Sequence, residues 1–277
     1  MKRSNFFEFK NGNKASLPFS NQEYENRLIG LRKIISENNL DAVILTSMQN
    51  VAYYSGFLYC SFGRPYSCIV TEKKNVVVSA NIDAGQPNRR CYGENLIYSD
   101  WERDNYLKAI VSLVKKVKKI GIEKDHLTVE RYQNLKDALD APEMVDISPF
   151  TMQQRMIKSN EEIVLIKSGA KIADIGGEAL VKEIKVGASE IDIAMVGRDA
   201  IEKAIVNSRN ETQTRDYLIE CLYKNKKVLP GYPSIIEPIE LVQLLETTPP
   251  PSGIYGNYSL RFLQDIWQQQ PYIQLTS

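Results

Sequence analysis

The sequence has little of the chemistry on which the commonest catalytic motifs depend. Its 277 residues include one histidine, His126, which excludes zinc sites built from several histidines and the H-E-x-x-H peptidase motif. No C-x-x-C pair, G-x-S-x-G motif or G-x-x-x-x-G-K-[ST] loop occurs. We therefore interpret the four widely spaced cysteines as small buried side chains: Cys60, Cys68, Cys91 and Cys221.

The chain also lacks an excess of charge and any long apolar run. Lys and Arg number 35 against 34 Asp and Glu, so the net charge of +1 gives no electrostatic basis for binding nucleic acid or an anionic membrane. No apolar stretch approaches the roughly 18 residues that a membrane span requires. Residues 1–10 are not followed by the apolar core of a signal peptide. We expect a cytoplasmic protein whose partners include neither nucleic acid nor a membrane.

Short apolar strands alternate with amphipathic helices over the first part of the chain. Ser20 and Glu23 have the spacing of a capping box, and the helix that they begin ends at Asn38 and Asn39. This pattern is typical of an α/β layer domain, which we place at residues 1–155. The other predicted elements are strands at 41–46, 68–71, 76–80, 120–123 and 144–147, a short helix within 47–56, and helices at 104–118 and 128–139.

A second segment, residues 156–216, contains two long amphipathic helices. Ser159 and Glu162 form a capping box for the first helix, which we expect to end at Gly187. The second helix begins at Ser189. Helices with an apolar face need a sheet to pack on, and no clear strand follows them. We therefore predict the start of an α+β domain that is incomplete in this chain.

The composition changes after Asp216. Residues 217–277 contain seven of the twelve prolines and the run Gln268-Gln269-Gln270, without a period-two strand pattern. We expect this tail to be poorly ordered. So abrupt a change indicates a frameshift or an aberrant end of the coding sequence, and a native alternative ending is the second explanation.

Three motifs in the first domain carry a specific resemblance. The segments Ala52–Tyr66, Ser79–Arg90 and Tyr98–Tyr106 resemble the N-terminal domain of the creatinase family, the creatine amidinohydrolases. Residues Arg155–Ser159 are similar to the junction at which the second domain of that family starts. The likeness extends to about Asp216. Its Phe-Gly-Arg and Gly-Gln-Pro runs resemble creatinase more than the related proline-specific aminopeptidases.

The resemblance implies a homodimer. Each subunit would join an N-terminal α/β domain, with a mixed sheet flanked by helices, to a pita-bread α+β domain. In the family's reaction, water attacks the guanidinium carbon of creatine and gives sarcosine and urea, with neither metal nor cofactor. A loop of the N-terminal domain reaches the active site of the partner subunit. By this resemblance, Arg64 binds the carboxylate of the substrate and Phe62 forms a wall of the pocket.

Elementary chemistry supports the role that the resemblance gives to Arg64. A guanidinium group presents a planar fork to a carboxylate and stays charged at any working pH. Gly63 and Pro65 favour a fixed loop on either side of Arg64. We interpret the remaining candidates as structural: Arg89 and Arg90, which Asp83, Asp100 or Asp104 could neutralise, and His126.

The resemblance fails where the family's catalytic groups are expected. That family transfers protons with a histidine and glutamates of the pita-bread domain, but no histidine follows His126 and no later glutamate stands in a matching context. We assign no catalytic residue and no metal ligand. Acid–base catalysis needs a group of suitable pKa beside the reacting atom. We therefore predict a creatinase-like hydrolase that is inactive as this chain alone. The alternative is a non-catalytic N-terminal domain that acts as a binding or dimerisation module.

Overall fold

The computed structural model describes residues 4–10, 12–58, 64–83, 86–114 and 116–208. The chain divides into two compact units, residues 1–157 and 158–277, and each is described by itself. The predicted tail at 217–277 lies outside the described residues. No helix in the described part of the chain is long and apolar enough to cross a membrane.

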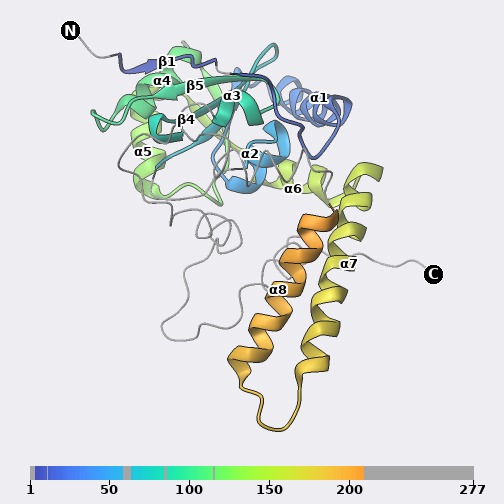
Figure 1. The fold of residues 1–277 in the computed structure, drawn as a ribbon. Coiled ribbons are helices and arrows are strands. Elements are labelled where there is room, and N and C mark those ends of the chain that lie inside the picture. The colour runs from blue at the N-terminus through green and yellow to red at the C-terminus, as the bar shows by residue number, and fades with distance from the viewer. Residues whose placement is uncertain (1–3, 11, 59–63, 84–85, 115, 209–277) are drawn as a thin grey trace. The chain divides into compact units, whose positions relative to one another are not determined.

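One mixed sheet organises the first unit (Figure 1). Its described strands follow the order β1-β5-β4-β3-β2-β6-β7. The pairs β4–β5, β2–β6 and β6–β7 are parallel, whereas β1–β5, β2–β3 and β3–β4 are antiparallel. This confirms the predicted α/β class with a mixed sheet. The strands are β1 (Phe6–Phe7), β2 (Ala42–Leu45), β3 (Ser67–Val70), β4 (Asn75–Ala80), β5 (Glu94–Tyr98), β6 (Lys119–Ile122) and β7 (Glu143–Asp146).

Helices cover both faces of this sheet. Val43 and Leu45 of β2 pack in one buried cluster with residues of α1 (Asn21–Glu37) and α2 (Met48–Ser55). Ala42 and Ile44, on the opposite face, pack with α4 (Asn105–Leu113) and α5 (Val129–Ala138). Burial on both faces explains why the strands are continuous apolar runs rather than alternating ones. Two short helices, η1 (Asn81–Asp83) and α3 (Gln86–Arg90), and then α6 (Ser148–Met156) complete the unit.

Both ends of α2 are set by local chemistry. The side chain of Ser47 accepts a hydrogen bond from the amide of Asn50 at 3.2 Å and so caps the first turn. Gly56 ends the helix in the left-handed region, with φ of +73°. A Cβ atom there would also lie 2.8 Å from the hydroxyl of Tyr24. Glycine is therefore required at this position both for its backbone conformation and for its size.

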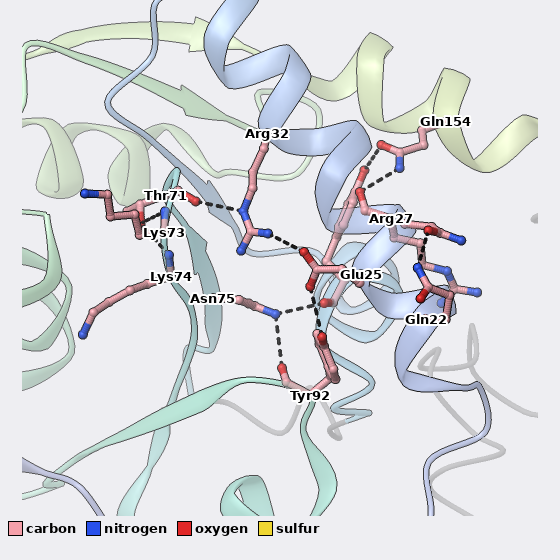
Figure 2. Close-up of polar contacts among 12 residues, drawn as sticks. Gln22, Glu25, Arg27, Arg32, Thr71, Lys73, Lys74, Asn75, Tyr92 and Gln154 are labelled. Carbon is pink, nitrogen blue, oxygen red and sulfur yellow. Dashed lines mark hydrogen bonds and ion pairs between the residues drawn. The ribbon is translucent and has the colours of Figure 1, made fainter.

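Polar side chains tie α1 to the strands and to α6 (Figure 2). Glu25 accepts hydrogen bonds from Arg32 at 2.9 Å and from the hydroxyl of Tyr92 at 3.0 Å. Gln154 of α6 donates to the backbone carbonyl of Arg27 at 2.9 Å. The carboxamide oxygen of Gln154 accepts from the hydroxyl of Tyr54, also at 2.9 Å. These contacts make α6 part of the first unit.

A buried carboxyl group lies where β2 and β6 end. Glu123 follows β6 directly and is 1% exposed. It accepts hydrogen bonds from the amide of Thr46, from the amide of Ser47 at 2.8 Å and from the hydroxyl of Ser47. The side-chain amide of Asn50 donates to it at 2.6 Å. Asn50 also contacts Arg155 of α6, whose guanidinium donates to its oxygen at 3.1 Å. Glu123 thus links two strand ends to α2 and, through Asn50, to α6.

Replacing Glu123 tests how much this link stabilises the first unit. Glu123→Gln places an N–H donor where the native side chain offers only acceptors, so at least one buried donor loses its partner. We expect the free energy of unfolding to fall by about 2–4 kcal/mol, measured by urea denaturation followed by circular dichroism. Glu130→Gln, at an exposed ion pair with Arg103, is the control and should change it by less than about 0.5 kcal/mol. Equal effects of the two variants would contradict a structural role for Glu123.

The second unit contains a helical hairpin, α7 (Asn160–Glu183) and α8 (Glu190–Ser208). The predicted capping box of Ser159 and Glu162 is present in both directions. The helix ends at Glu183, before the predicted Gly187, which lies in the connecting turn with φ of +91°. The two helices approach closely at small residues, because a Cβ atom on Gly176 would lie 2.5 Å from Ile201.

The hairpin leaves many apolar side chains exposed. Among its described residues, burial is confined to Gly176, Gly197 and Ile201. This agrees with the expectation of helices that need a further partner, since contiguous exposed apolar surface favours association. The exposed apolar side chains are Ile163, Val164, Leu165, Ile175, Val181, Ile184, Val186, Ile191, Met195 and Val196.

Amide hydrogen exchange should separate the two units. The strands β2, β3 and β4 are fully buried, whereas α7 and α8 bury little besides their mutual contact. Local opening is easiest where few apolar contacts resist it. We expect amides of α7 and α8 to exchange at least about 100-fold faster than those of the three strands, which serve as the internal reference. Equal protection would show that another segment or another copy covers the hairpin.

Candidate functional site

Arg64, the binding residue predicted from the sequence, lies near the edge of the sheet at which β4 and β5 end. β4 and β5 are parallel, with Ala80 opposite Tyr98 at their carboxyl ends. β3 runs antiparallel to β4 and pairs its first residue, Ser67, with Val78. The loop that carries Arg64 into β3 therefore meets the segments that follow β4 and β5. In α/β sheets, ligands bind preferentially beyond the carboxyl ends of strands.

Arg64 is presented to solvent and held by one carboxylate. Its Nη1 atom lies 3.5 Å from Oδ1 of Asp100, two residues beyond β5. The side chain of Arg64 is 48% exposed and that of Asp100 is 22% exposed. Among the residues that the structure describes, Arg64 makes no other hydrogen bond or ion pair. A guanidinium group with free N–H donors in this setting can bind a carboxylate.

Three tyrosines hold the backbone on the C-terminal side of Arg64. The hydroxyl of Tyr98 donates to the carbonyl of Pro65 at 3.0 Å, and that of Tyr106 donates to the carbonyl of Tyr66 at 3.3 Å. The hydroxyl of Tyr66 donates to a carboxylate oxygen of Asp83 in η1. Hydrogen bonds from three elements thus fix the path of the chain that leaves Arg64.

The environment keeps two of these hydroxyls protonated. Burial raises the pKa of Tyr98, and the negative charge of Asp100 raises it further. Burial raises the pKa of Tyr106 to about 12. Both groups therefore remain hydrogen-bond donors at any physiological pH. The arrangement offers recognition of an anion through Arg64 supported by neutral tyrosines, rather than proton transfer.

The structure places some of the predicted residues and not others. Arg64 lies in an exposed loop, as binding requires, and its contact with a carboxylate ligand remains a prediction. Phe62 lies outside the described residues. Cys68 and Cys91 are buried as predicted, whereas Cys60 and Cys221 also lie outside the described part.

Sequence reasoning missed the partner of Arg64. Asp100 was a candidate to neutralise Arg89 or Arg90, but it pairs with Arg64 instead. Arg89 contacts the N-terminal segment, where its Nε atom donates to the carbonyl of Asn13 at 3.4 Å. The signal for Asp100 was its position two residues after β5. β5 and β3 both border β4, so the end of β5 lies near the start of β3, where Arg64 is found.

The role of His126 is local. His126 lies in the turn after β6, where its amide donates to the carbonyl of Glu123 at 3.3 Å. No three His, Cys, Asp or Glu side chains within the described ranges lie close enough together to hold a metal ion.

Comparison with known sequences gives the family context of this arrangement. Residues 27–157 match the family described as Creatinase/Prolidase N-terminal domain. The chain is 44% identical over 209 residues to Creatinase from Bacillus sp. (strain B-0618), covering 74% of this chain and 51% of that protein. It is 28% identical over 174 residues to Putative dipeptidase YkvY from Bacillus subtilis (strain 168), covering 61% of this chain and 47% of that protein. The chain thus spans about half the length of the curated relatives it matches.

Solved structures show the same fold. The prolidase from Pyrococcus horikoshii OT3 matches with a TM-score of 0.56 and 21% identity, over 64% of this chain and 48% of that one. The Xaa-Pro dipeptidase from Bacillus anthracis matches with a TM-score of 0.55 and 24% identity, over 65% of this chain and 49% of that one. Residues 27–157 therefore form a creatinase/prolidase N-terminal domain.

Proposed function

We propose that this chain is the N-terminal portion of a creatinase-type hydrolase subunit, in which Arg64 binds the carboxylate of creatine or a similar guanidino acid. The observation that carries the proposal is the 44% identity to Creatinase over 209 residues. The matched family domain, residues 27–157, includes Arg64 and Asp100. The exposed guanidinium of Arg64 supports it, since its only ion pair among the described residues is with one carboxylate oxygen at 3.5 Å. The prolidase structures, below 25% identity, bear on the fold alone.

In the proposed reaction, water adds to the guanidinium carbon of creatine. The bond from that carbon to the methylated nitrogen breaks, that nitrogen takes up a proton, and sarcosine and urea are released. Arg64 contributes by holding the carboxylate, which fixes where the guanidinium carbon lies. We propose that it does so across a homodimer, together with Phe62, and that the reaction uses neither metal nor cofactor. We also propose that the protein acts in the cytoplasm.

We further propose that this chain alone does not hydrolyse creatine efficiently. Its one histidine, His126, lies in the turn after β6, where its amide is bound to Glu123. Without a group that delivers a proton to the leaving nitrogen, the rate should fall by about 10²–10⁴.

The alternative function is a non-catalytic module that binds a ligand or forms dimers. The observation that favours it is the exposed apolar surface of α7 and α8.

Ligand binding by the full chain tests the role of Arg64. Creatine is titrated into wild-type protein and Arg64→Ala at low ionic strength, with binding followed by isothermal titration calorimetry or amide chemical shifts. We expect Arg64→Ala to weaken binding at least about tenfold, because it removes charge-assisted hydrogen bonds. Arg103→Ala removes an equally charged, exposed side chain from the loop before α4 and should change the affinity less than about twofold.

Urea release by the same preparations completes the test. The expected result is weak binding without measurable hydrolysis. Hydrolysis at the rate of a complete creatinase would refute the proposed inactivity. Creatine binding that is equal in wild-type protein and Arg64→Ala would refute the role of Arg64, and the non-catalytic module would then be the better explanation.

A further inference from the structure

The contact between Arg64 and Asp100 engages only one corner of the guanidinium group. The distance of 3.5 Å is to Nη1. Within the described residues, neither Nε nor Nη2 has a hydrogen-bond or ion-pair partner. These two atoms form the edge that binds a carboxylate through two parallel hydrogen bonds. The ion pair therefore leaves a complete binding edge of Arg64 available.

Asp100 depends on Arg64 in turn. Its Oδ1 atom is buried and has no hydrogen-bond partner among the described residues. Arg64 is its ion-pair partner there. A buried carboxylate oxygen without hydrogen bonds is costly unless a positive charge lies close to it. The two side chains thus stabilise one another in this arrangement.

The backbone that carries Asp100 is firmly placed. The amide and the hydroxyl of Ser99 donate to the carbonyl of Asn5, at 2.9 and 2.8 Å. The side-chain amide of Asn105 donates to the carbonyl of Ser99 at 3.0 Å. Ser99 and Asn105 are both fully buried. Asp100 therefore projects from a segment that is tied both to the N-terminal strand region and to the start of α4.

Two carboxylates, Asp100 and Asp83, contact Arg64 or the residues that follow it. Asp83 accepts the hydrogen bond of Tyr66, two residues after Arg64. The hydroxyl of Tyr98, two residues before Asp100, donates to the carbonyl of Pro65, which follows Arg64. One cation and two carboxylates repel a ligand that carries only negative charge. They attract a ligand that presents a carboxylate to Arg64 and a cation to the aspartates.

We infer that Asp100 is a positioning and specificity-determining residue for Arg64: it holds Nη1, leaves the Nε–Nη2 edge to an incoming carboxylate, and makes the site select zwitterionic acids over dianions. The inference rests on the proposed function, because it assumes that Arg64 binds the ligand carboxylate. It adds a second residue to that site and a rule for the charge of the ligand.

The test compares two ligands of opposite charge pattern in the full chain. Creatine is the zwitterion and succinate the dianion, and each is titrated at low ionic strength, where exposed charges are least screened. Asp100→Asn preserves shape and removes the charge. We expect the ratio of the two dissociation constants to shift at least about tenfold towards succinate. The variant removes both the attraction between Asp100 and the cation of creatine and the repulsion between Asp100 and succinate, and the two effects multiply in the ratio. Asp100→Glu keeps the charge and should hold the ratio within about threefold of the wild-type value.

Asp104→Asn is the matched control. Asp104 is an exposed carboxylate in the same segment, and among the described residues it makes neither a side-chain cap nor an ion pair. It should leave the ratio unchanged, and circular dichroism of each variant checks that the fold is retained.

The outcomes separate this inference from the proposed function. If Arg64→Ala abolishes creatine binding but Asp100→Asn leaves the ratio at the wild-type value, the role of Asp100 is refuted and that of Arg64 stands. A ratio changed equally by Asp104→Asn would show a general charge effect and would also refute it. If Arg64→Ala binds creatine as the wild type does, both the proposed function and this inference fail.

Discussion

The hydrogen bonds to Glu123 are the constraint on which the first unit depends. Two parallel strands, β2 and β6, end at the same place, and the chain turns from β2 directly into α2. Burial removes water as a partner for the amides of Thr46 and Ser47, which connect β2 to α2, so the protein itself must supply an acceptor. One carboxyl group, supplied by the residue after β6, accepts from Thr46, Ser47 and Asn50 together. Without it, the buried amides of Thr46 and Ser47 would lose this acceptor.

The same edge of the sheet also carries the candidate site. β2 and β4 both run antiparallel to β3, so they run parallel to each other, and the strands β4, β5, β2, β6 and β7 all end on one side. At the β2–β6 end of this edge, the protein supplies its own anion, Glu123, to the donors that gather there. At the β4–β5 end, Arg64 has a donor edge that no described residue fills. One topological feature thus has an internal bond at one end and, as we propose, binds a carboxylate at the other.

Sequence patterns predicted the elements whose signals are local. The start of α1 at Ser20, the central strands β2, β3 and β4, and the capping box of α7 all have short-range causes in propensity and capping.

Elements that depend on distant partners were missed. β1 is two residues long and exists because Phe6 and Phe7 pair with β5. α6 was not predicted as a helix, although Pro149 in its first turn is a start signal, and Gln154 bonds to α1. The pairing of Arg64 with Asp100 joins residues distant in sequence, and only the order of the strands brings them together.

The strength of a single half-exposed arginine limits what this domain can contribute to binding. A hydrogen bond to a charged group contributes about 1.5–3 kcal/mol, whereas micromolar affinity requires about 8 kcal/mol. Arg64 cannot supply that by itself, and its pairing with Asp100 lowers its net positive charge further. Selectivity is different, because it depends on the difference between two ligands rather than on the total. A cation flanked by two carboxylates discriminates among charge patterns even when it binds all of them weakly. We therefore regard the edge formed by Arg64, Asp100 and Asp83 as an element that orients and selects an acid, while other contacts with the ligand must provide most of the affinity.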